Sequence, residues 1–180
     1  IFEDCYILNF NMKIKIFLSE EQLQDLYIPF GANENRHTMQ YWNLLDKREN
    51  IFLMIAKETT EDVAYADGSY TRKWEDSGLR TGTMKHLVRG YFNQNEQRYL
   101  KKCSAVNPRN IFAKPSIFMK SDKMTILTEE EWKKYENLIP NKKNSFWIID
   151  EQSNVARWNP SNRSLDHCFS NSEILAVICI

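Results

Sequence analysis

Cysteine and histidine are the residues of this chain whose chemistry could support catalysis or metal binding. The chain has four cysteines, Cys5, Cys103, Cys168 and Cys179. No two of them form a C-x-x-C pair. Among the three histidines, only His167 has a cysteine as its neighbour. A zinc site needs several such side chains turned toward one point, which adjacent residues do not provide, so we expect no metal and no cofactor. Cys168 and a distant histidine could form a nucleophile and base, but a buried structural thiol is the expected state.

The catalytic and phosphate-binding signatures that can be read from a sequence are missing. The chain has no G-x-S-x-G, H-E-x-x-H, G-x-G-x-x-G or G-x-x-x-x-G-K-[ST] motif. Its five glycines weigh against a glycine-lined phosphate cradle. Glu129, Glu130 and Glu131 resemble a carboxylate cluster, but acidic residues in a first helical turn are stabilised by the helix dipole. The sequence therefore favours a protein that is not an enzyme.

Charge is balanced over the whole chain and unbalanced along it. Basic and acidic residues number 24 each, whereas residues 72–123 contain 12 basic and 4 acidic residues, a net charge of +8. The basic residues of this segment include Arg72, Lys73, Arg80, Lys85, Arg89, Arg98, Lys101 and Lys102. They could follow a phosphate backbone while the interleaved Tyr91, Phe92 and Tyr99 stack on bases. Alternatively, the rings face the core and the basic residues form a solvated helix face, which their helical spacing favours.

Hydrophobic periodicity predicts strands on either side of a central helical block. Strands are expected at 13–18, 39–46, 51–56, 124–127, 146–149 and 174–180. The second and third surround the polar turn 46–50 and predict a hairpin in the middle of a sheet. Helices are expected at 79–92 and 96–103, a surface loop at 57–77, and capping-box helix starts at Ser19 and Thr128. This order predicts an α+β domain with mainly antiparallel strands.

The chain is expected to form a single domain over residues 12–180. Its length matches one domain, and no repeat or low-complexity linker divides it. Residues 1–11 precede Met12 and are an N-terminal extension of uncertain status. No apolar span of about 18 residues predicts a transmembrane helix, and the N-terminal region lacks the pattern of a signal peptide. We therefore expect no membrane insertion.

Several segments together resemble a bacterial domain family of unknown function, numbered 6273, that occurs in many surface-associated and secreted multi-domain proteins. The matching segments are, in order, Ile28-Pro-Phe-Gly31, Tyr41-Trp-Asn-Leu-Leu-Asp46, Trp74-Glu-Asp-Ser-Gly-Leu-Arg80, residues 121–132, and the strands 146–149 and 174–180. The resemblance covers residues 28–180. It implies a fold similar to the C-type lectin and formylglycine-generating-enzyme group, a cell-surface or secreted location, and no catalytic residue. The chain departs from the family at Phe146-Trp147-Ile-Ile-Asp150, where a Trp-Trp-Leu-Arg-Ser-Pro-like motif is usual.

The third of these segments also has a structural interpretation that does not depend on the resemblance. Ser77 is expected to cap the following helix. Trp74 is expected to anchor the loop by burial, and Arg80 to bond nearby carbonyl groups.

Two hypotheses for function follow. The leading one is a non-catalytic module of lectin-like fold that binds a protein or glycan, because Tyr and Trp offer stacking area together with a polar group. Its candidate surface is the set of polar, aromatic-bearing loops: Tyr65, Tyr70, Trp158 and Asn159. A core position for Trp158 is an equally good interpretation. The alternative is a nucleic-acid-binding or phage-type inhibitor protein that acts through the basic segment 72–123.

Overall fold

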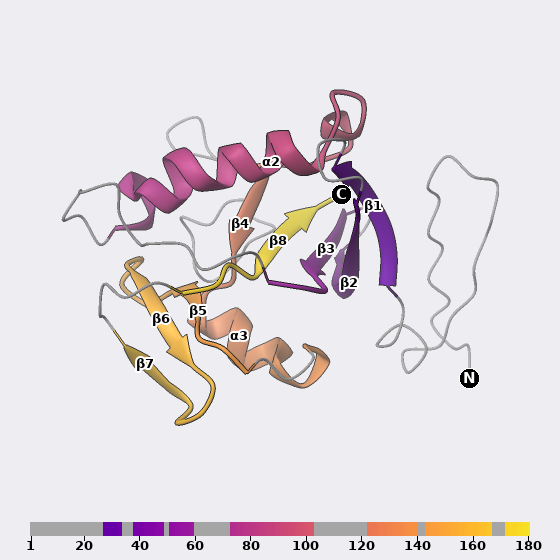
Figure 1. Cartoon of the computed structure of the whole chain (residues 1–180). Coiled ribbons are helices and arrows are strands. Elements are labelled where there is room, and N and C mark those ends of the chain that lie inside the picture. Colours follow the sequence, from indigo (N-terminus) through magenta and orange to yellow (C-terminus); the bar gives the residue numbers. More distant parts are fainter. Residues whose placement is uncertain are drawn as a thin grey trace, which may run out of the picture.

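The protein is an α+β structure with eight strands in the part of the chain that the computed structural model describes (Figure 1). The described residues are 27–33, 38–48, 51–59, 73–102, 122–139, 143–166 and 172–180. A five-stranded sheet has the order β1-β2-β3-β8-β4, and all of its neighbours are antiparallel. Its strands are β1 (Tyr27–Asn33), β2 (Thr38–Arg48), β3 (Ile51–Ala56), β4 (Met124–Ile126) and β8 (Ala176–Cys179). The second antiparallel sheet contains β5 (Phe146–Ile149), β6 (Val155–Asn159) and β7 (Ser164–Asp166).

The predicted hairpin lies in the middle of the larger sheet. β2 and β3 pair from Trp42 and Ala56 to Arg48 and Ile51, so β2 extends into the segment that was expected to form a polar turn. The pairing register shifts at a bulge in β2, which adds one residue to that strand. On its other side β3 pairs with β8. The hairpin is therefore confirmed, with β2 ending at Arg48 instead of Asp46.

Both faces of the larger sheet are covered by other elements. Strand alternation sends Met54 to one face and its neighbours Leu53 and Ile55 to the other. The first face packs under helix α2 (Lys85–Tyr91), and the second packs against α3 (Glu129–Tyr135) and the smaller sheet. Figure 1 shows α2 on one side of the sheet, and α3 with β5, β6 and β7 on the other. The fold consequently has two core clusters that share one sheet.

The helix that carries the central basic segment begins at the predicted Ser77 cap. The Ser77 hydroxyl accepts a hydrogen bond from the Arg80 N–H at 3.2 Å and donates to the Trp74 carbonyl at 2.9 Å. A π-helical turn, Leu79–Met84, then continues directly into α2. Trp74 is buried, and the Arg80 guanidinium donates to the Glu75 carbonyl at 3.0 Å. The roles expected for these three residues are therefore confirmed.

α3 begins at the predicted capping box. The Thr128 hydroxyl accepts from the Glu131 N–H at 3.2 Å, and the Glu131 carboxylate accepts from the Thr128 N–H at 3.0 Å. Glu129 pairs with Lys133 one turn later at 2.6 Å. The hydrogen bond and the charge of Glu129 raise the pKa of the Lys133 ammonium above its ordinary value. Glu131 therefore caps the helix and Glu129 stabilises it, as the structural interpretation of this carboxylate cluster predicted.

Other parts of the secondary structure differ from the expectation. In the described residues, the helix expected at 96–103 is only a 3₁₀ turn, Glu96–Arg98. The chain cannot continue helically because Lys101 pairs with Cys179 of β8, donating its N–H to the Cys179 carbonyl at 2.7 Å. Strands β1, β6 and β7 were not predicted. The strand expected at 13–18, the helix start at Ser19 and the extension 1–11 lie outside the described residues.

Candidate binding surfaces

Trp158, one of the four predicted binding residues, lies in the core. Its side chain is 7% exposed, and its ring centroid is 5.8 Å from that of Trp132 on α3. It lies on β6 directly opposite Phe146, whose side chain belongs to the same core cluster. Of the two interpretations left open by the sequence, the structure supports the core position. This ring provides no binding surface.

Of the remaining residues of that predicted surface, the structure describes Asn159. Asn159 is half-buried, and its Oδ1 accepts a hydrogen bond from the Ser161 N–H at 3.0 Å. This bond within the turn occupies the amide oxygen, so the residue shapes the loop after β6. Tyr65 and Tyr70 lie outside the described residues.

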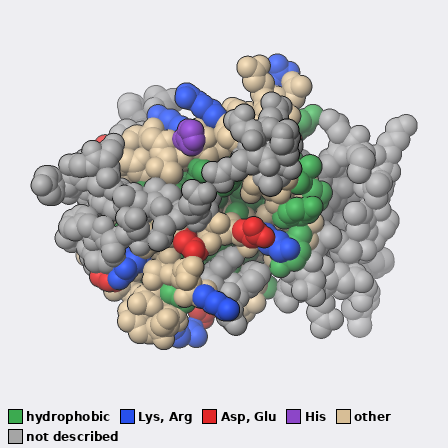
Figure 2. Space-filling model, viewed as in Figure 1, with side chains coloured by type: hydrophobic (Ala, Val, Ile, Leu, Met, Phe, Trp, Pro, Cys, Tyr) green, Lys and Arg blue, Asp and Glu red, His purple; other side chains and the backbone are tan. Residues whose placement is uncertain are grey.

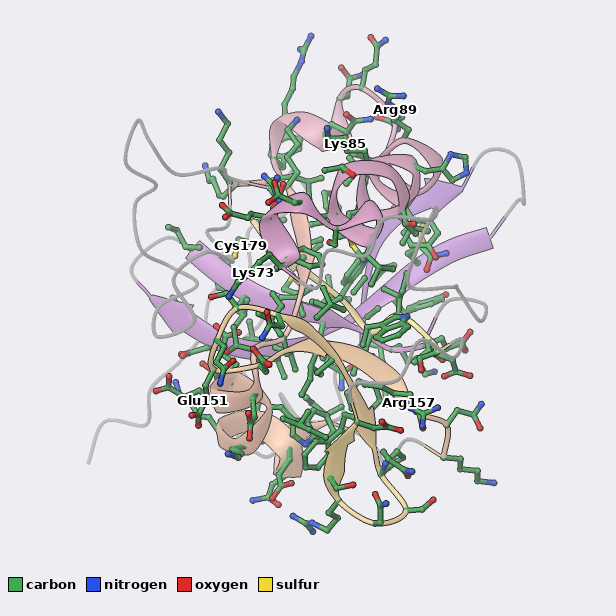
Figure 3. The ribbon with its side chains drawn as sticks, turned by 90° about the vertical axis from the view of Figure 1, so that its left-hand side faces the viewer. Lys73, Lys85, Arg89, Glu151, Arg157 and Cys179 are labelled. Atoms are coloured by element: carbon green, nitrogen blue, oxygen red, sulfur yellow. The ribbon has the colours of Figure 1, made fainter. Side chains whose placement is uncertain are left out.

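The residues of the predicted basic segment do not all lie together. Lys73 donates to the Gln152 carbonyl at 2.6 Å and its backbone bridges to Asn154, so it attaches the turn between β5 and β6 to the rest of the fold. Figure 3 shows it well apart from Lys85 and Arg89. Arg80, which the sequence grouped with these residues, is buried and pairs with Asp122 at 2.7 Å. Arg72 lies outside the described residues.

Among the described residues of the segment, Lys73 and five other basic residues are exposed, and we call those five the basic surface: Lys85, Arg89, Arg98, Lys101 and Lys102. Lys85 and Arg89 are one turn apart on α2, and Figure 3 shows them together on one side of the helix. In the space-filling view, Lys and Arg side chains lie along the upper edge of the molecule, over α2 (Figure 2). Within the described part of the chain, Lys85, Arg89, Arg98 and Lys102 form no ion pair.

The aromatic residues of the same segment divide between the core and the surface. Phe92 is buried, and its ring centroid lies 5.9 Å from that of Trp42. Tyr91 is partly buried against the same core cluster. Tyr99 is 52% exposed. The prediction that the aromatic rings face the core is therefore confirmed for Phe92 and wrong for Tyr99.

Side chains of the loop after α2 form hydrogen bonds to the backbone just before Arg98 and Tyr99. The Asn93 N–H donates to the Glu96 carboxylate at 2.9 Å, and the Glu96 N–H donates back to Asn93 Oδ1 at 2.9 Å. Gln97 donates from its side chain to the Phe92 carbonyl at 2.9 Å. These reciprocal bonds fold the loop compactly against the end of α2.

A second exposed surface, which the sequence analysis missed, lies on β1 and β2. We call it the sheet patch: Tyr27, Pro29, Met39, Tyr41 and Lys57. Met39 and Tyr41 are each 46% exposed on the same face of β2, and Pro29 is exposed directly opposite Tyr41. The Lys57 ammonium stands 4.2 Å from the Tyr27 ring centroid and 5.9 Å from that of Tyr41. In Figure 2 hydrophobic side chains gather over β1.

The sheet patch is the part of one sheet face that α3 leaves uncovered. On the same face of β2, farther along the strand, Asn43 and Leu45 are buried, and Leu45 packs in the core cluster of α3. The sequence did contain one sign of this patch, which is the period-two alternation along β2. This alternation places Tyr41 on the sheet face opposite to that of the buried Trp42. The sequence could not show where the cover on that face ends.

Asp46 joins β2 to α3 at the border of this covered region. Its carboxylate accepts from the Tyr135 hydroxyl at 2.6 Å, from the Lys134 ammonium at 2.9 Å and from the Lys47 N–H at 2.8 Å. Burial raises the pKa of the Asp46 carboxyl, but these hydrogen bonds and the Lys134 charge together lower it below its ordinary value. The carboxylate therefore stays ionised and fixes the position of α3 on the sheet.

Groups for metal binding or nucleophilic chemistry do not converge in the described part of the chain. No three His, Cys, Asp or Glu side chains gather there in a way that could hold a metal ion. Cys179 is a buried free thiol in β8. Cys168, His37 and His167 lie outside the described residues, so the structure does not place the nucleophile and base that the sequence considered.

Comparisons with known proteins give no relative: no protein-family model, curated protein or solved structure matches the chain. Among the described residues, no helix is long and apolar enough to cross a membrane.

Proposed function

We propose that this chain is a non-catalytic binding module of lectin-like fold that holds a glycan on the sheet patch. The observation that carries the proposal is the exposure of Met39 and Tyr41, at 46% each, on one face of a paired strand. The resemblance of residues 28–180 to a lectin-like domain family agrees with a binding role, and so does the antiparallel α+β arrangement. Fold analogy alone is weak support for function, whereas the exposed side chains of the patch have a definite chemistry.

The chemistry of the patch suits a sugar ring. A tyrosine ring has an apolar face and a hydroxyl that can form hydrogen bonds, and a sugar offers both an apolar face and hydroxyl groups. Lys57 lies within cation–π distance of Tyr27 and Tyr41, which limits the motion of both rings before a ligand arrives. A restrained ring loses less conformational entropy on binding.

The size of the patch favours a glycan over a protein. A stable protein interface buries about 800 Å² on each partner, with a well-packed apolar centre. The described patch offers two large exposed apolar side chains and one proline, which is too few for such a centre. A single saccharide unit needs only one or two rings.

The proposal is tested by a glycan array probed with the wild-type chain and with Tyr41→Ser. Truncating a tyrosine at the centre of a binding site is expected to weaken binding roughly tenfold or more. Tyr99→Ser is the matched control, because Tyr99 is exposed to a similar extent but lies outside the sheet patch. If no glycan is bound by the wild-type chain, or if both variants lose binding equally, the proposal is wrong.

A further inference from the structure

We infer that the basic surface binds single-stranded nucleic acid, independently of the sheet patch. The chain around this surface is strongly basic. Residues 79–102 contain six Lys or Arg residues and one acidic residue, Glu96. Of the six, Arg80 is buried and paired with Asp122, which leaves the five residues of the basic surface exposed.

The one acidic residue of this stretch does not offset these charges by pairing with them. The Glu96 carboxylate is half-buried and accepts the Asn93 N–H, so it closes the loop after α2. Ion pairs of the described residues lie elsewhere: Lys133 pairs with Glu129, Lys134 with Asp46, and Arg163 with Glu136. Lys85, Arg89, Arg98 and Lys102 differ from these three exposed cations, because they form no such pair in the described part of the chain.

A polyanion with regularly spaced charges is the partner that such a surface fits. Lys85 and Arg89 are separated by one helical turn, about 6 Å along the axis, so both can contact successive anionic groups. Each cation that meets a phosphate releases a counterion, which provides favourable and salt-dependent binding energy. A small anion would use only one of these cations at a time.

Tyr99 selects a single strand over a duplex. Its ring is 52% exposed and lies between Arg98 and Lys101 in sequence. Bases of a duplex are stacked on each other, whereas bases of a single strand can stack on an exposed aromatic ring beside basic residues. The hydrogen-bonded loop 93–97 fixes the backbone that leads into Tyr99, whose N–H donates to the Glu96 carbonyl at 3.0 Å, so less backbone entropy is lost when this segment binds.

The test is fluorescence anisotropy with a labelled oligothymidylate of about 20 nucleotides, titrated at several salt concentrations between roughly 50 and 200 mM. Lys85→Gln with Arg89→Gln is expected to weaken binding and to reduce the slope of log affinity against log salt by about 1.4, since each phosphate contact contributes about 0.7. Tyr99→Ser is expected to weaken binding about tenfold or more while the slope stays unchanged. Circular dichroism confirms that the variants fold.

The matched control removes the same charge from another region. Lys133→Gln with Arg163→Gln neutralises two exposed cations on α3 and on the turn between β6 and β7. If this control reduces the slope as much as the α2 double variant, binding reflects overall charge and the inference is wrong. It is also wrong if the wild-type chain shows no binding. The same holds if a duplex or a sulfated polysaccharide binds as tightly as the oligothymidylate without dependence on Tyr99.

Because Tyr41 lies outside this surface, Tyr41→Ser is expected to bind oligothymidylate normally, which separates this test from the glycan test.

Discussion

Replacing Gly31 with alanine is expected to destabilise the protein strongly, because this position has an unusual backbone angle and no space for a side chain. Gly31 has a φ of +93°, which residues with a Cβ rarely adopt. A Cβ built there lies 2.7 Å from the Tyr91 carbonyl oxygen and 2.7 Å from the Phe92 ring. The oxygen is part of the backbone at the end of α2, so rotation of a side chain cannot relieve both contacts. Either β1 or the end of α2 has to move.

The magnitude can be estimated from two contributions. A residue with a Cβ in the left-handed region costs roughly 1–2 kcal/mol, and overpacking a dense core costs a further 1–3 kcal/mol or so. The second contribution applies in full because the Phe92 ring is fixed by its neighbours, with centroids 5.1 Å from Phe30 and 5.9 Å from Trp42. Together they predict a loss of about 2–5 kcal/mol, a large part of the roughly 5–15 kcal/mol that stabilises a typical domain.

Urea unfolding followed by tryptophan fluorescence measures this loss, with Gly82→Ala as the matched control. A Cβ built at Gly82 meets nothing within 4 Å, and alanine favours a helix over glycine by about 1 kcal/mol. The same chemical change is therefore expected to lower the free energy of unfolding at Gly31 and to raise it at Gly82. A Gly31→Ala variant within about 0.5 kcal/mol of wild type, the range of an ordinary surface substitution, would refute the reasoning.

Two further predictions concern the attachment and the start of α3. Asp46→Asn is expected to cost about 1 kcal/mol at neutral pH, allowing for solvent screening of a partly exposed carboxylate. Because the folded pKa of Asp46 lies below its ordinary value of 3.8, its contribution is complete above that pH and disappears as the pH falls through the lower folded value. Urea titrations at pH 7 and near pH 3 should therefore show a smaller difference between the two proteins at low pH, and an equal difference at both would contradict this account. Thr128→Ala is expected to cost about 1 kcal/mol by thermal unfolding, whereas Thr128→Ser, which keeps the hydroxyl, should stay close to wild type; equal losses would show that the methyl group matters and the cap does not.

Local chemistry explains why some elements were predictable. The Thr128 capping box and the Ser77 cap depend on residues within four positions of each other, so their partners can be read from the sequence. The hairpin of β2 and β3 is similarly local. Strand β8 was also predictable because every residue from Ile174 to Ile180 is apolar and buried, as expected of a strand covered on both faces.

Long-range pairing explains the errors. Residues 96–103 have a helical pattern, but Lys101 pairs with Cys179, some 78 positions later, and the ladder of β8 overrides the local preference. β1 contains Pro29 and Gly31, which reduce strand propensity. It nevertheless pairs with β2 because it is an edge strand with a bulge, where proline is tolerated and a glycine with positive φ is useful.

The position of the binding surfaces depends on the same long-range packing. Trp158 and Tyr41 look similar in sequence, since each is an aromatic residue with a polar residue next to it. Trp158 faces Trp132 of α3 and is buried, whereas the face of β2 that carries Tyr41 extends past the end of that helix. An aromatic residue on this sheet can contact a ligand only where no other element covers it. The element that covers this face of β2 lies about 90 residues away from Tyr41 in the sequence. A polar neighbourhood is consequently a poor guide to exposure in a sheet that is covered on both sides, and strand alternation read together with the limits of the covering helix is a better one.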